Sequence, residues 1–250
     1  MARSQPADGI GTTIVAIRET WHTKNHPFFQ KMLDGSLPLR ALGIYMAQHY
    51  KFVSRAVPSK GLIYWRAGAD VRKAIAENLA EEEGVRAPPL EGHVAHDHWQ
   101  MISNFCHAAG LSDDEIKNTE PTPAWWARTL HYLQTNRDEP VGVALAMESS
   151  QEGQQVALNS EVTIPSFEKH YGFTRDSAEI SFFVEHAEAD NGHSTRQLDL
   201  CTKYLDTPEL RARAIEVCEQ AVRLRWASIT DLYRQHVLKE DELLPDGVTS

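Results

Sequence analysis

The sequence predicts an all-α fold, and three observations point to it. From about residue 13 onward, apolar residues recur at intervals of three and four, which is the spacing of one face of an α-helix. The alternating pattern of β-strands is sustained nowhere along the chain. Residues that favour helix ends separate the periodic stretches. We therefore expect one helical domain spanning residues 1–250, with flexible tails at about 1–10 and 241–250.

Each expected helix is bounded by residues that favour helix ends. Gly84 and the Pro88-Pro89 pair interrupt the chain after an acidic segment, and Gly110 follows a long apolar face as a C-terminal cap would. Ser112 and Thr207 are each followed by acidic residues or proline, which is typical of a helix start. To within a few residues, the helices are expected over 12–22, 26–33, 38–55, 57–65, 69–83, 94–109, 122–135, 140–160, 164–170, 175–203 and 207–237.

Composition and charge exclude several classes of protein. The chain of 250 residues carries 25 basic against 35 acidic residues, so it lacks the basic surface of a nucleic-acid-binding protein. No apolar run is long enough to cross a membrane, and the first residues lack the apolar segment of a signal peptide. We therefore expect a cytoplasmic protein that binds neither nucleic acid nor membrane. Cys106, Cys201 and Cys218 are expected to be buried thiols.

The segment from His186 to His193 has the spacing of a metal-binding helix face. On an α-helix, His186, Asp190 and His193 fall within a sector of about 60°. Imidazole nitrogen and carboxylate oxygen suit iron, manganese or zinc, and two histidines with one carboxylate form the ligand type of non-haem iron oxygenases. The alternative is a solvated polar face, which the spacing alone leaves open.

Acidic residues 81–83 end the fifth expected helix, one turn after Glu77. Carboxylates at a helix C-terminus are disfavoured by the helix dipole and by mutual repulsion, a cost that a nearby cation would relieve. A solvated acidic surface is the alternative. Downstream, His98 shares a helix face with Met101 and Phe105, so it points toward the core side, where an imidazole needs a partner.

Glu148 and Glu152 lie four residues apart and therefore share a face of the helix expected over 140–160. Their carboxylates could bridge two metal ions or could be solvated. Other catalytic motifs are missing from the sequence, which has no H-E-x-x-H, no G-x-S-x-G and no Gly-rich phosphate loop. A ferritin-type site needs two E-x-x-H segments, and only Glu19 with His22 fits that pattern.

Several of these segments together resemble the haem-oxygenase-like di-iron oxidases. The resemblance is to the group of para-aminobenzoate synthases and, more distantly, to pyrroloquinoline quinone synthase-like and TenA-like proteins, and it covers about residues 25–235. Its most specific part is Glu185-His186-Ala187-Glu188-Ala189-Asp190-x-x-His193. The other matching segments are Asn78–Gly84, a histidine ahead of Ala108-Ala109-Gly110-Leu111, Glu152, and Tyr171-Gly172-Phe173.

The resemblance implies an all-α bundle of about seven core helices that holds a six-ligand metal site. Carried over by position, the metal ligands are Glu82, His98, Glu152, His186, Asp190 and His193. Three of these positions have competing neighbours, namely Glu81 for Glu82, Glu148 for Glu152, and His93 or His96 for His98. Glu82, Glu152 and His186 are the residues expected to take part directly in the chemistry.

The chain departs from the family in ways that limit the activity it implies. The para-aminobenzoate synthases need a tyrosine in the first helices and a lysine after the bridging glutamate, but the corresponding segments here read His26-Pro27-Phe28-Phe29 and Ser160-Glu161-Val162. That activity is therefore not expected. A pocket histidine and an arginine of the quinone synthase are replaced by Glu82 and His49, although Lys60 matches that enzyme.

The expected activity is that of a non-haem di-iron oxidase or oxygenase. Two Fe(II) ions would bind per chain, O₂ would be the co-substrate, and an external electron donor could supply electrons. The substrate is expected to be a small amino acid or carboxylate that is oxidised, N-oxygenated or cleaved at a C–C or C–N bond. His49, Lys60 and Arg66 are the candidate anchors for its carboxylate, and a homodimer is expected. The alternatives are a cofactor-independent oxidase similar to pyrroloquinoline quinone synthase and a non-catalytic helical binding protein.

Overall fold

The computed structural model describes residues 9–85 and 97–240, and for residues 188–196 it describes the backbone only. Within these ranges the chain is all-α, which confirms the predicted fold class. The α-helices are α1 (Ile10–Thr20), α2 (Pro27–Leu33), α3 (Leu39–Arg66), α4 (Ala69–Glu82), α5 (His98–Ala108), α6 (Asp113–Lys117), α7 (Pro123–Asp138), α8 (Val141–Glu152), α9 (Gln155–Leu158), α10 (Ile164–Ser166), α11 (Ser181–Tyr204) and α12 (Pro208–Leu232). Short 3₁₀ or π turns are η2 (Thr23–Asn25), η3 (Asn159–Thr163), η4 (Phe167–Tyr171), η5 (Ala178–Ile180) and η6 (Tyr233–Leu238).

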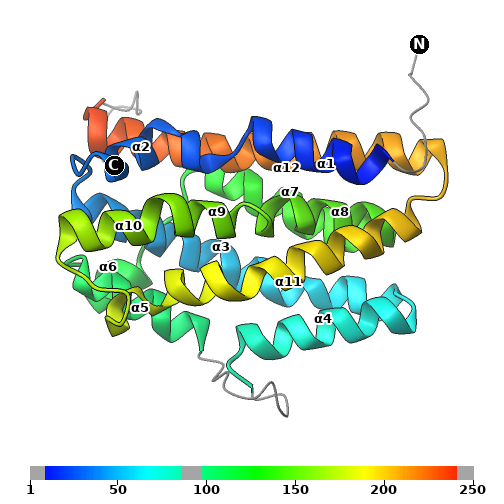
Figure 1. The fold of residues 1–250 in the computed structure, drawn as a ribbon, viewed down its shortest axis with the longest axis horizontal. Coiled ribbons are helices and arrows are strands. Elements are labelled where there is room, and N and C mark those ends of the chain that lie inside the picture. Colours follow the sequence, from blue (N-terminus) through cyan, green and yellow to red (C-terminus); the bar gives the residue numbers. More distant parts are fainter. Residues whose placement is uncertain (1–8, 86–96, 241–250) are drawn as a thin grey trace.

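The long helices run side by side along the length of the molecule (Figure 1). Helix α8 packs against both α11 and α12, and α12 also packs against α1 and α7. Helix α3 packs against α7, α4 and α5, the last two lying at the lower edge of Figure 1. Because α11 contacts α4, α5 and α8, it joins the parts of the bundle that carry the candidate metal ligands.

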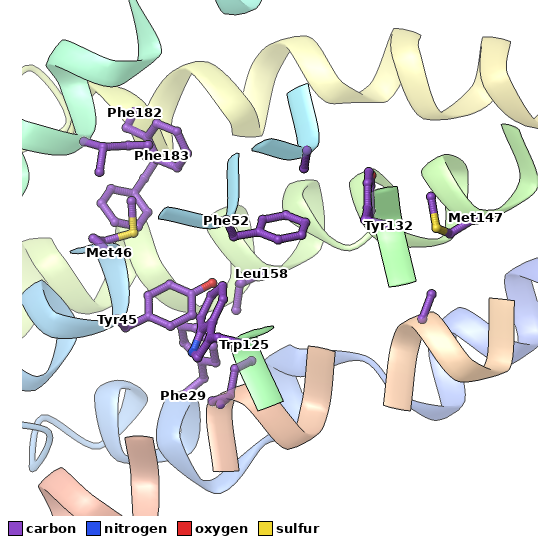
Figure 2. Close-up of a cluster of buried hydrophobic side chains, with 14 of the residues drawn as sticks. Phe29, Tyr45, Met46, Phe52, Trp125, Tyr132, Met147, Leu158, Phe182 and Phe183 are labelled. Carbon is purple, nitrogen blue, oxygen red and sulfur yellow. The ribbon is translucent and has the colours of Figure 1, made fainter. Parts of the chain in front are cut away.

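Aromatic side chains form much of the core between α3, α7 and α11 (Figure 2). Phe52 of α3 meets Tyr132 of α7 edge to face, with ring centroids 5.2 Å apart. Trp125, fully buried at the start of α7, also lies against Phe52, while Phe182 and Phe183 enter from α11. Aromatic pairs of this kind contribute about 0.5–1.5 kcal/mol each beyond the apolar area they bury. The aromatic core therefore fixes how α3 sits against α7, and Phe182 of α11 meets α3 at the His49 ring.

The expected break between helices near residue 56 is wrong, because α3 continues through Pro58 to Arg66. Proline cannot donate the hydrogen bond that residue 58 would make to the carbonyl of Ser54. Both Pro58 and Ser54 are exposed, so water can replace the missing donor. Val57 and Ser59 on either side are buried and continue the core face of the helix. Burial of that face outweighs the local penalty at the proline.

Two other regions differ from the expected helix boundaries. The helix expected over 140–160 ends at Glu152, and the chain continues through α9 and the π turns η3 and η4, where backbone bonds span five residues instead of four. The start signal at Ser112 belongs to the short helix α6, whose capping box with Glu115 is formed. The cap at Gly110 is confirmed by its φ of +83°, a conformation that glycine adopts without strain.

Helices α8 and α11 approach each other closely at Gly142. A Cβ at this position would lie 2.8 Å from the backbone carbon and oxygen of Tyr204, so no larger residue fits without a shift. This crossing lies at the other end of α8 from Glu152 and sets the spacing of the two helices. The three cysteines are free and buried, as predicted. Among the described helices, none combines the length and apolar composition needed to cross a membrane.

Candidate metal centre and its cavity

Glu82 and His98 meet where α4 ends and α5 begins. The Glu82 Oε2 atom lies 2.7 Å from His98 Nδ1. The backbone bridge between Glu83 and Asp97 holds the two helix ends together, and the Asp97 side chain caps α5 by accepting from the Trp99 amide. Burial alone would raise the pKa of Glu82, but the His98 hydrogen bond and nearby positive charge hold it below its usual range.

His98 and His186 lie side by side, with ring centroids 4.7 Å apart. The His186 Nδ1 atom donates to the Phe182 carbonyl at 2.7 Å, which leaves Nε2 as the nitrogen with a free lone pair. A backbone carbonyl that fixes one ring nitrogen in this way is a common partner of metal-bound histidine. Burial, together with the nearby His98, lowers the pKa of His186 to about 4, so the ring is neutral at pH 7. A neutral imidazole is the form that binds metal.

Lys60 lies among three carboxylates. Its Nζ atom is 2.6 Å from Glu152 Oε1, 3.8 Å from Glu148 Oε2 and 3.9 Å from Glu82 Oε1. The same ammonium group donates to Asn78 at 2.5 Å, and only 3% of Lys60 is exposed. Burial would lower its pKa, but the carboxylates outweigh burial and raise it. The structure therefore places Lys60, expected as a substrate anchor, where it balances the charge of the candidate metal ligands.

Glu148 and Glu152, both on α8, have different surroundings. Glu148 is fully buried and accepts hydrogen bonds from Tyr132 at 2.5 Å and Asn136 at 2.8 Å. Burial and the neighbouring Glu152 raise the pKa of Glu148 to about 7, although Lys60 opposes them. Glu152 lines the cavity and accepts from the Gln197 amide at 2.7 Å. Of the two alternatives that the sequence left open, Glu152 is the one that faces the cavity.

The remaining predicted ligands are only partly described. Asp190 and His193 belong to α11, so their predicted place on the same helix as His186 is confirmed, but their side chains lie outside the described residues. His93 and His96, the alternatives to His98, also lie outside them. Among the side chains that are described, no three His, Cys, Asp or Glu residues form a metal-binding geometry. The described part of the predicted set brings together Glu82, His98, His186 and, through Lys60, Glu152.

These donors fit a metal in their chemistry. Carboxylate oxygens and a neutral imidazole, with a further histidine, make up the oxygen and nitrogen set that iron takes in proteins. Lys60 already places positive charge between Glu82 and Glu152, and His98 places it beside Glu82, which is where a bound cation would gain most from the carboxylates. Burial would lower the pKa of His98, but hydrogen bonds to Glu185 and Glu82 outweigh burial and raise it to about 10. Metal binding at these residues would therefore require His98 to release a proton.

A cavity of about 70 Å³ connects the candidate ligands to a second group of polar side chains. Aromatic and apolar residues of α3, α5 and α11 form its walls. The polar and charged lining residues are His49, Lys60, Glu82, His98, Arg128, Tyr132, Gln151, Glu152, Gln155, His186 and Arg225.

The three predicted substrate anchors have different positions. His49 lines the cavity and packs between Trp125 and Phe182, and its buried Nδ1 atom has no partner among the side chains that the structure describes. Lys60 lines it among the carboxylates. Arg66 does not line the cavity, since it donates to the backbone oxygens of residues 135 and 136 near the end of α7. The role of Arg66 as an anchor therefore stays a prediction.

Two buried arginines of the cavity were missed by sequence reasoning. Arg128 and Arg225 are 4% and 2% exposed. A signal was present in the pattern, because Arg128 follows Trp125 by three residues and precedes Tyr132 by four, which puts it on the apolar face of its helix. Arg225 likewise precedes the buried Ile229 by four residues. A charged residue on an apolar face is the informative exception to the usual pattern.

Comparison with known proteins identifies the family. Residues 44–226 match the model of a family described as iron-containing redox enzymes, and the chain belongs to that family. A 4-aminobenzoate synthase of Chlamydia muridarum is 26% identical over 184 residues, covering 73% of each chain. Another 4-aminobenzoate synthase, from Nitrosomonas europaea, is 23% identical over 235 residues, covering 88% of this chain and 89% of the other.

Solved structures show the same fold. A domain of unknown function with a haem oxygenase-like fold from Shewanella denitrificans superimposes with a TM-score of 0.74 at 15% identity, covering 95% of this chain and 96% of that one. A TenA homologue from Pseudomonas syringae pv. tomato gives a TM-score of 0.71 at 12% identity and covers 94% and 98%. The predicted haem-oxygenase-like bundle is therefore confirmed.

Proposed function

We propose that this chain is an O₂-dependent non-haem di-iron oxidase or oxygenase that acts on a small amino-acid or carboxylate substrate. The observation that carries the proposal is the meeting of Glu82, His98 and His186 beside the Lys60–Glu152 pair, at one cavity. Membership in a family of iron-containing redox enzymes supports the choice of iron. The polar and apolar lining of the same cavity supports a small-molecule substrate.

The proposed ligands are Glu82, His98, Glu152 and His186, together with Asp190 and His193 of α11. Iron bound there would supply the one-electron chemistry with O₂ that amino-acid side chains lack. The chain holds the ligands in place through their neighbours: the Phe182 carbonyl orients His186, and the Gln197 amide orients Glu152. Phe52 and Phe182 line the cavity and exclude water from the reacting groups.

The proposed reaction uses a separate small molecule and not a side chain of the protein itself. Where the resemblance places a reactive tyrosine, Phe28 and Phe29 are fully buried in the core. Where it places a lysine, the exposed Glu161 forms an ion pair with Lys24 at 2.9 Å. Neither segment offers the group that the para-aminobenzoate synthases need, so we propose a different substrate from theirs.

Anaerobic addition of Fe(II) to the purified chain, followed by O₂, tests the proposal. We expect two equivalents to bind and O₂ to be consumed afterwards in proportion to the bound iron. His186→Ala should lower the stoichiometry below two, whereas Glu161→Gln, at an exposed ion pair, should leave it unchanged. Absence of iron binding by the folded chain would contradict the proposal. Metal-independent O₂ consumption with a quinone precursor would favour the cofactor-independent oxidase.

A further inference from the structure

We propose that Arg128 and Arg225, with Gln151, form an anion-binding subsite in the cavity that takes the carboxylate group of a short substrate. That the bound carboxylate belongs to the substrate rests on the proposed function, but the binding of a carboxylate at this subsite does not. The subsite lies in the same cavity as the candidate metal ligands and uses none of them.

Arg128 is buried without an ion pair among the described residues. Its guanidinium lies over the Phe52 ring at 3.9 Å and within 5.1 Å of the Trp125 ring centroid. Within the described part of the chain, Arg128 forms one hydrogen bond, from an Nη atom to Gln151 Oε1 at 3.3 Å, and its buried Nε has no acceptor. A guanidinium has five N–H donors, so the buried Arg128 has donors left over at the cavity wall.

Gln151 joins the two arginines. Its side-chain oxygen accepts from Arg128, and its backbone oxygen accepts from Arg225 at 2.6 Å. Arg225 also donates to Gln155 at 3.3 Å. The buried Gln151 Nε2 is a further donor that has no acceptor among the described residues. This part of the cavity lining is therefore rich in donors and positive charge.

Burying Arg128 in this way is costly unless an acceptor completes its hydrogen bonds. A charge in the interior without a partner is strongly unfavourable, and a buried donor without an acceptor adds to that cost. Burial and the neighbouring Arg225 lower the pKa of Arg128 to about 9, so the charge is still present at pH 7. A carboxylate supplies two acceptor oxygens in the plane that a guanidinium fork matches.

The size of the cavity limits the ligand. The cavity has a volume of about 70 Å³. It has room for a carboxylate on a short chain. At the other polar part of the lining, Lys60 and His98 already balance the charges of Glu82 and Glu152, so the positive charge that attracts an anionic ligand lies at the arginines.

Binding of ¹³C-labelled propionate to the chain in the presence of EDTA tests the subsite without iron. Titration followed by the NMR signal of the labelled carboxylate should give saturable binding, and propionamide, which has the same shape without the charge, should bind at least tenfold more weakly. Propionate should also raise the melting temperature of the wild-type chain at constant ionic strength. Equal binding of propionate and propionamide would overturn the proposal and requires no variant.

Variants locate the binding. Arg128→Met should weaken propionate binding at least tenfold, and Arg128→Lys should retain more of it. Arg137→Met is the matched control, because Arg137 lies on the same helix in an exposed pair with Asp138. Undiminished binding by folded Arg128→Met would place the anion elsewhere and overturn the proposal. If propionate binds as expected and iron does not, only the proposed function fails; if iron binds and propionate does not, only the subsite fails.

Discussion

The Lys60 ammonium lies 2.6 Å from one carboxylate oxygen of Glu152, at a point where two other glutamates come within 4 Å. This pair joins the C-terminal part of α3 to the end of α8 inside the bundle. Because Lys60 is 3% exposed, solvent screens the interaction little. The pair therefore controls both the stability of the bundle and the charge available to a bound metal.

Replacing Lys60 by Met should destabilise the chain by about 3–5 kcal/mol, the usual cost of leaving buried charges without their partner. The measurement is the free energy of unfolding in urea at pH 7. Lys73→Met is the matched control, since Lys73 is 81% exposed and its helical pair with Glu77 should contribute less than about 0.5 kcal/mol. Equal effects of the two substitutions would show that the buried pair contributes no more than a surface pair. Added Mn(II) should stabilise Lys60→Met more than the wild type, because the ion replaces the lost positive charge.

Glu148→Gln and Glu152→Gln should affect iron binding differently. Glu148 accepts from Tyr132 and Asn136 and does not line the cavity, so its substitution should leave two equivalents of Fe(II) bound under anaerobic conditions. Glu152→Gln should lower the stoichiometry, because the amide removes a charged ligand. Chelator competition measures both. Loss of iron from the Glu148 variant alone would reverse the choice between the two glutamates.

Because of the buried His26, we expect the folded chain to lose stability in acid. The residue is 1% exposed, its Nδ1 caps α2 by accepting from the Phe28 amide, and burial lowers its pKa to about 4. Between pH 6.5 and 4 the unfolded chain binds a proton that the folded chain does not, so the free energy of unfolding falls as the pH falls.

His26→Asn keeps a capping oxygen and removes this titration. The decrease in unfolding free energy between pH 7 and 4.5 should then be smaller than in the wild type, by about 2 kcal/mol. Urea unfolding across this pH range measures it. His107→Asn, at an exposed site, controls for the loss of a histidine. An unchanged pH dependence in His26→Asn would mean that His26 is protonated in the folded chain.

Two glycines in helices should respond oppositely to alanine. Gly142→Ala puts a methyl group 2.8 Å from the Tyr204 backbone, and overpacking of this kind costs about 1–3 kcal/mol. Gly61→Ala, within α3, meets nothing within 4 Å and should stabilise the chain by about 0.5–1 kcal/mol through helix propensity. Denaturant unfolding measures both. Stabilisation of Gly142→Ala would contradict the close crossing of α8 and α11.

Much of the fold was predictable, because local chemistry determines it. The helical periodicity predicts the bundle, and the caps at Gly110 and Ser112 lie where the sequence places them. Pro58 misled the prediction, since a local rule about proline cannot show that its neighbours are held by burial on a 28-residue helix. Packing against other helices keeps α3 helical through Pro58, and the residues next to the proline in sequence do not reveal that packing.

The candidate site was predictable only as far as residue type and helix position reveal it. Glu82, His98 and His186 could be selected because their residue types and helix positions suit a metal. The partner of Lys60 could not be predicted, because it lies on another helix far along the chain. Arg128 was overlooked because a lone basic residue is usually on the surface, although its position between Trp125 and Tyr132 was a usable signal.

The candidate site draws on α3, α4, α5, α8 and α11, which extend from Leu39 to Tyr204. No short segment of the chain contains it, so the site forms only when contacts distant in sequence are made. A ligand that binds there is linked by mass action to unfolding of the whole bundle and not to one helix. Occupancy of the cavity should therefore protect amides across all five helices from hydrogen exchange, including those far from the ligand.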